Sequence, residues 1–91
     1  MNNNEFYGYA IIGIDSIYSM GRTKEDAITN FYIDYDEGSI DLVSLNSLFS
    51  RGSGYALLKC TKDLYRIALQ LGIPGASLLY EIYDDSFIGV M

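Results

Sequence analysis

The chain of 91 residues contains no histidine, one proline and one cysteine. Without histidine, the usual general base near neutral pH and the commonest zinc ligand are missing. A nucleophile activated by a neighbouring imidazole is excluded as well. The single cysteine, Cys60, has no partner for an internal disulfide, and its place at the end of an apolar segment predicts a small buried hydrophobe.

Signatures of cofactor or metal binding are also missing. No glycine-rich segment carries the trailing Lys-Ser/Thr of a phosphate-binding loop or the third glycine of a dinucleotide fingerprint. The carboxylates that begin at Asp34 invite a calcium interpretation, but the sixth position is Ser39 instead of glycine, and the twelfth is Leu45 instead of glutamate. A chain this small also has little room for a cleft around a catalytic pair of carboxylates. We therefore expect no enzymatic activity, no cofactor and no metal.

Positive charge is scarce. The chain has twelve acidic and six basic residues, which gives a net charge of −6 and a sequence pI near 4.2. This balance argues against direct binding of nucleic acid, whose affinity comes largely from lysine and arginine. It suits a protein that docks onto a basic surface, and equally one that is simply soluble. No apolar run approaches the roughly 20 residues that a bilayer requires, so we expect no membrane segment and a cytoplasmic protein.

The patterns predict one α+β domain over residues 1–91, with residues 1–4 frayed. The expected fold is a small sandwich, with one antiparallel sheet of about four to five strands and two main helices on one face. The strands are expected at 5–14, 54–60, 77–83 and 87–91, with 17–20 as a further short strand unless 5–20 is one long bent strand. The last strand, if it lies outermost, offers an unpaired edge for a homodimer.

The clearest local signal is a capped helix that begins at Thr23. Thr23 and Asp26 have the spacing of a capping box, and Gly38 is the expected end. Apolar side chains at helical spacing form its core-facing stripe: Ile28, Phe31, Tyr32 and Tyr35. A short second helix is expected around Leu42, Leu45, Leu48 and Phe49.

A third helix is expected over residues 62–71, with Thr61 as its cap and Gly72 as its stop. Its buried stripe is predicted to be Leu64, Ile67, Ala68 and Leu71.

Tyrosine is abundant, with nine residues, which is more than so small a core needs. Some must be exposed, and tyrosine is enriched at binding hot spots. Acidic residues gather beside the tyrosines at the end of the capped helix, a composition that fits a docking face for a basic partner. The predicted partner-binding residues are Tyr32, Asp34, Tyr35, Asp36, Glu37 and Asp41, together with Asp84 and Asp85 in the last turn.

As a small acidic chain without histidine or a catalytic motif, and with a tyrosine-acid surface, the protein resembles the small phage-encoded inhibitors of bacterial immunity, especially anti-CRISPR proteins. The resemblance concerns the character of the whole chain, because these inhibitors share no common motif. It implies that clusters such as Asp34, Asp36, Glu37 and Asp41 imitate nucleic-acid phosphates. Their partner would then be a CRISPR effector subunit or another nucleic-acid-binding host protein.

A second, local resemblance covers residues 21–30, Gly-Arg-Thr-Lys-Glu-Asp-Ala-Ile-Thr-Asn. This segment is similar to the Gly-x-Thr-x-Glu-Glu-Ala-Leu-x-Asn helix start that follows a β-hairpin in HicB-type antitoxins, although their usual Pro-Gly before the helix is missing. It implies neutralisation of a small toxin. The expected functions are thus a non-enzymatic inhibitor first, an antitoxin second and a homodimeric interaction module third.

Overall fold

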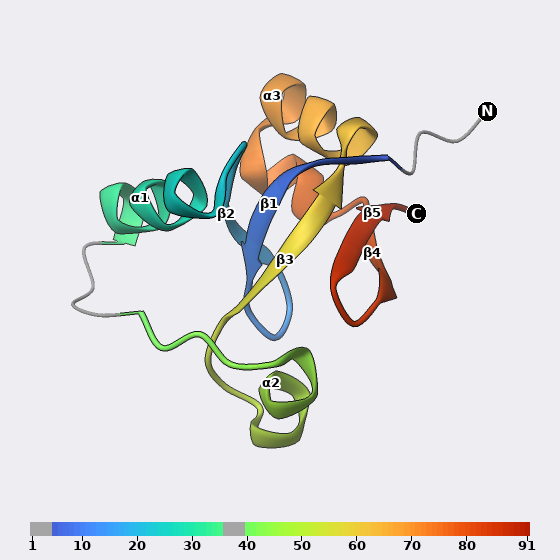
Figure 1. Ribbon diagram of the computed structural model, residues 1–91. Coiled ribbons are helices and arrows are strands. Elements are labelled where there is room, and N and C mark those ends of the chain that lie inside the picture. The colour runs from blue at the N-terminus through green and yellow to red at the C-terminus, as the bar shows by residue number, and fades with distance from the viewer. Residues whose placement is uncertain (1–4, 36–39) are drawn as a thin grey trace.

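The computed structural model describes residues 5–35 and 40–91 as a mixed five-stranded sheet with three helices (Figure 1). The α+β class predicted from the sequence is confirmed. In chain order the elements are β1 (Phe6–Ile12), β2 (Ile17–Gly21), α1 (Lys24–Tyr35), α2 (Leu45–Arg51), β3 (Ala56–Thr61), α3 (Lys62–Ser77), β4 (Tyr80–Asp84) and β5 (Phe87–Val90).

The strands lie in the order β2-β1-β3-β5-β4. Strand β1 is antiparallel to both β2 and β3, and β4 is antiparallel to β5, but β5 runs parallel to β3. The prediction of a wholly antiparallel sheet is therefore wrong. After β3 the chain crosses one face of the sheet as α3, and the β4–β5 hairpin then brings it back beside β3 in the same direction.

Strand β5 lies between β3 and β4, so it is not the unpaired edge on which the homodimer hypothesis rested. The outer strands are β2 and β4. Two-residue pairing anchors β5 to β3, with Lys59 opposite Phe87 and Cys60 opposite Ile88. The conditional prediction of a dimer through residues 87–91 is thus overturned by the strand order.

Both faces of the sheet are apolar near its centre, and each has its own helix. Along β1, Tyr9 and Ile11 belong to the cluster that packs under α1, whereas Ala10 and Ile12 belong to the cluster that packs under α3. Successive side chains of a strand point to opposite faces, so these two clusters lie on opposite sides of the sheet. The prediction that both main helices share one face is wrong because this double apolar pattern requires cover on both sides.

The capped helix is confirmed as α1. The backbone amide of Asp26 donates to Thr23 Oγ1 at 3.0 Å, and Phe31 is fully buried beneath the helix. The predicted stop at Gly38 lies outside the described residues.

The short helix α2 begins later than predicted. Ser44 caps it by accepting from the Ser47 amide, and Gly52 ends it with a left-handed φ of 69°. Leu42 is not helical, because it instead forms a parallel bridge with Tyr55.

Helix α3 is capped by Thr61, whose Oγ1 accepts from the Leu64 amide at 3.2 Å. Gly72, with φ 80° and ψ 169°, interrupts the helix as predicted, but a further helical segment follows through Ser77. Residues 77–79 are therefore not strand, and β4 starts at Tyr80. Leu71, predicted to be buried, is 61% exposed, and its side chain lies against Gly75 of the helical segment that follows the interruption.

Candidate binding surfaces

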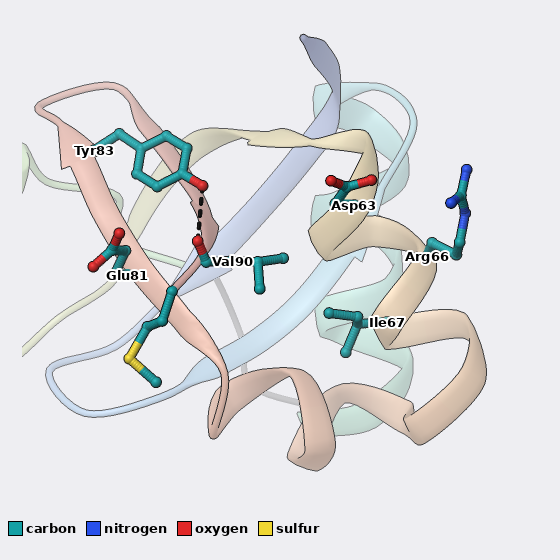
Figure 2. Close-up of a pocket in the computed structure, with 7 residues that line it drawn as sticks. Asp63, Arg66, Ile67, Glu81, Tyr83 and Val90 are labelled. Carbon is teal, nitrogen blue, oxygen red and sulfur yellow. Dashed lines mark hydrogen bonds between the residues drawn. The ribbon is translucent and has the colours of Figure 1, made fainter. Parts of the chain in front are cut away.

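A groove of about 660 Å³ lies between α3 and the β4–β5 hairpin (Figure 2). The Asp63 and Glu81 carboxylates approach it from different walls, the first from α3 and the second from β4. The Tyr83 hydroxyl donates to the Val90 carbonyl at 2.8 Å, so its proton is already engaged. The lining offers charge and apolar surface, but it presents no nucleophile beside a base.

The thiol of Cys60 is fully buried, as the sequence predicted. Burial raises the pKa of this thiol to about 12, although a backbone hydrogen bond to Gly8 acts in the opposite direction. A thiol with so high a pKa is a poor nucleophile.

Within residues 5–35 and 40–91, no three His, Cys, Asp or Glu side chains lie close enough together to hold a metal ion. Over the same ranges, every helix is too short or too polar to cross a lipid bilayer.

The acidic and tyrosine residues predicted at the end of α1 are partly brought together. Asp34 and Tyr35 are exposed in its last turn, and Asp41 is exposed beyond the loop. Tyr32 is half-buried, and its hydroxyl accepts from the Ile40 amide at 2.9 Å, which ties α1 to the segment that carries Asp41. Asp36 and Glu37, predicted to belong to the same cluster, lie outside the described residues.

Tyr35 combines packing with exposure. Its ring lies 5.3 Å from the Tyr18 ring and 5.0 Å from the Phe31 ring, yet 40% of the residue is exposed. Burial, and secondly the negative charge of Asp34, raise the pKa of its hydroxyl. A rigid, half-exposed aromatic ring next to a carboxylate is typical of an interface hot spot.

Asp84 and Asp85 occupy the β4–β5 turn. The Asp84 carboxylate accepts from the Ser86 amide at 2.8 Å, so this residue shapes its own turn. Asp85 lines a groove of about 330 Å³ together with Val43 and Asn46.

Asp34 and Tyr35 line a different groove, of about 590 Å³, beside the β1–β2 turn. The predicted residues thus face two grooves.

Sequence reasoning missed a cluster of cations and aromatic rings at the start of β1. The Arg22 guanidinium lies 3.7 Å from the centre of the Tyr7 ring, and Arg22 Nε donates to the Tyr7 carbonyl. Three more of the six basic residues lie 5.7–5.8 Å from rings of β1: Lys24, Lys59 and Lys62. These residues are scattered in sequence. The pairing of β1 with β2 brings Arg22 and Lys24 to the rings and its pairing with β3 brings Lys59 and Lys62, so no local sequence pattern predicted the cluster.

Comparison with known proteins gives no family assignment: no protein-family model matches the chain, and no curated protein or solved structure proves similar to it.

Proposed function

We propose that this protein is a non-enzymatic inhibitor that docks its acidic end onto the basic surface of a nucleic-acid-handling protein. The acidic end comprises Asp15 in the β1–β2 turn, Asp34 and Asp41 around the end of α1, and the Asp84–Asp85 turn. In its most specific form, the proposal is an anti-CRISPR protein that acts in the cytoplasm of a bacterial host on an effector subunit.

The scarcity of cations at one end of the sheet carries this proposal. Both hairpin turns and α2 lie at one end of the sheet, in the lower half of Figure 1. Four of the six basic residues lie instead over the rings at the start of β1, which pairs with the end of β3. The acidic end therefore has few neutralising cations of its own. Its negative electrostatic potential attracts a groove lined with lysine and arginine.

An exposed anchor within the acidic end supports docking over mere solubility. Tyr35 sits on a packed base of Tyr18 and Phe31 and projects beside Asp34. Rigid aromatic groups lose little conformational entropy when they bind, so Tyr35 can supply contact area while the carboxylates supply steering.

The test is affinity capture from bacterial lysate on the immobilised protein at low salt, followed by a salt gradient and mass spectrometry of the eluate. The variant removes four charges: Asp34→Asn, Asp36→Asn, Glu37→Gln and Asp41→Asn. The matched control removes four charges elsewhere: Glu5→Gln, Glu25→Gln, Asp63→Asn and Glu81→Gln. We expect a nucleic-acid-binding protein to be retained by the native chain and the control, lost by the variant, and displaced by free duplex DNA or RNA.

Equal retention by the variant and the control would contradict phosphate mimicry. Loss of the partner after Tyr35→Ala but not after charge removal would instead indicate docking by hydrophobic burial.

The antitoxin function remains a second candidate because the resembling segment does follow a β-hairpin and does begin a helix. Gly21 fits closely under α1, since a Cβ there would lie 2.4 Å from the Ala27 nitrogen. The Asn30 side-chain amide donates to the Met20 carbonyl at 2.8 Å, and Thr23 caps the helix. Asn30 bonds the helix to the hairpin, Gly21 lets the two pack closely and Thr23 caps the helix, so the similarity concerns local structure. Recovery of a small toxic nuclease in the capture would favour this candidate.

A further inference from the structure

The sheet face opposite α3 carries a row of three residues in direct register. Tyr9 of β1 pairs with Lys59 of β3, and Lys59 pairs with Phe87 of β5. Directly paired residues project from the same side of a sheet. Since neighbouring strands lie about 4.8 Å apart, the two aromatic residues stand about 10 Å apart with a lysine between them.

No helix in the described part of the chain covers this row. Helix α1 packs over β2 and β1, and α3 packs over the other face. Figure 1 shows β3 and β5 with no helix in front of them. Lys59 is exposed, and Tyr9 and Phe87 are each half-buried in the sheet. The row is therefore open to solvent and supported from below.

Further rings and a second cation extend the row. Phe6 is 46% exposed, and its ring centre lies 5.3 Å from that of Tyr9 and 5.8 Å from Lys59 Nζ. Lys24 Nζ lies 5.8 Å from the Tyr9 ring centre. On the other side, the Tyr83 ring is stacked near that of Phe87, with an interplanar angle of 24°.

We propose that this open face binds a short single-stranded nucleic acid. Bases stack on Tyr9 and Phe87, and backbone phosphates contact Lys59 and Lys24. Aromatic side chains on an exposed sheet, interleaved with cations, suit unpaired bases because every base offers a flat π-face. In a duplex those faces are already stacked. The net charge of −6 argues against nucleic-acid binding that rests on electrostatics alone, so stacking must supply most of the affinity, and the same charge opposes a duplex more than a single strand.

A second copy of the chain fits this face less well. In a symmetric dimer the same patch meets itself, so Lys59 would approach its own equivalent close to the two-fold axis. Burying two like charges there is unfavourable. The inference stands apart from the proposed function because it rests on Tyr9, Lys59 and Phe87 and on none of the carboxylates of the acidic end, although Phe87 follows the β4–β5 turn and pairs with Asp84.

The test is fluorescence anisotropy with a labelled single strand of about eight uridines or thymidines at low salt. With two phosphates contacted, the logarithm of the binding constant should fall with the logarithm of salt concentration with a slope of about −1.4. Phe87→Leu keeps apolar bulk but removes the π-face, and we expect it to weaken binding by about fivefold to a hundredfold. Lys59→Gln should weaken binding and make the salt slope shallower.

Matched controls lie on α2, away from the row. Phe49→Leu makes the same change on an exposed ring, and Arg51→Gln removes the same charge. Both should leave binding unchanged, and a duplex of about equal length should bind more weakly than the single strand.

Three results would overturn the inference. The first is the absence of single-strand binding at low salt by a protein whose circular dichroism shows it folded. The second is a loss of single-strand affinity in Phe49→Leu or Arg51→Gln as large as in the row variants. Binding of duplex or of polyglutamate as tight as that of the single strand would count in the same way, because it would mean unspecific attraction. The third is concentration-dependent dimerisation in light scattering that Phe87→Leu abolishes, which would assign the face to a second copy.

Discussion

The two faces of the sheet are built from the same strands but differ in chemistry. The face under α3 is lined with small and aliphatic side chains that are almost fully buried: Ala10, Ile12, Leu58, Cys60 and Ile88. The opposite face carries tyrosine, phenylalanine and lysine, and α1 covers only its β1–β2 part. One face is thus committed to stability, while the other keeps surface on which a partner can bind.

The largest expected effect on stability comes from truncating a core side chain on the face that α3 covers, called the closed face below. Leu64 of α3 is fully buried, so Leu64→Ala should lower the free energy of unfolding by about 2–5 kcal/mol. Leu57 is half-buried on the opposite face. Leu57→Ala should lower the free energy of unfolding by only about 1 kcal/mol, because part of this side chain already faces water. Urea denaturation followed by circular dichroism measures both. Equal losses would break the contrast between the faces.

The thiol of the closed face gives a pH-dependent test. Burial raises the pKa of Cys60 from 9.0 to about 12, so the folded state holds this proton at pH values where the unfolded state loses it. The resulting stabilisation is complete below pH 9 and declines as the pH rises towards 12. The urea midpoint should therefore fall over this window, and less steeply in Cys60→Ala.

A thiol reagent supplies the independent check on Cys60. At pH 8 the Cys60 thiol of the native protein should react with the reagent only as fast as the protein unfolds. In concentrated urea the thiol should react at once. Rapid labelling of the folded protein would contradict the burial of this residue.

The helix caps give a smaller contrast. Thr61, which caps α3, is 1% exposed, whereas Thr23, which caps α1, is exposed. Thr61→Ala should cost about 1–2 kcal/mol, because it leaves the Leu64 amide without a partner away from water. Thr23→Ala should cost about 0.5–1 kcal/mol, because water can replace the lost oxygen. Urea titrations of the two variants measure the difference, and a larger loss at Thr23 would reverse the assignment.

The smallest effect on stability is expected at Gly89, on the open face. A Cβ there would meet the Tyr83 ring at 2.4 Å, so Gly89→Ala should swing this flexible ring aside and break its bond to the Val90 carbonyl. The cost should be about 1 kcal/mol or less. NMR of the ring protons would report the movement. Tyr83→Phe is the control, since it removes the hydroxyl and leaves the ring in place.

Local signals predicted the elements well and their arrangement poorly. The cap at Thr23 and the interruption at Gly72 depend on neighbouring residues, so the sequence displays them directly. The parallel pairing of β3 with β5 depends on where α3 carries the chain, which no short segment encodes. Placing both helices on one face failed because the run Tyr9-Ala10-Ile11-Ile12 is apolar on both sides, and alternation alone does not say which side a given helix will cover.

The candidate surfaces follow the same division. The acidic cluster around Asp34 and Asp41 is nearly contiguous in sequence and could be named from it. The row of Tyr9, Lys59 and Phe87 draws on residues far apart in the chain, and it exists only once the register of three strands is known.

The position of β5 between β3 and β4 sets an order for synthesis on the ribosome. Strands β1, β2 and β3 with α1 can associate as soon as residue 61 has emerged, since all their pairings are internal to that segment. Among the strands of residues 5–35 and 40–91, β4 pairs with β5 alone, so it must wait until Phe87–Val90 has been made and seated against β3. A ribosome that stalls before these residues would release a nascent chain with the β3 edge bare, which is a ready template for intermolecular strand pairing and a target for chaperones.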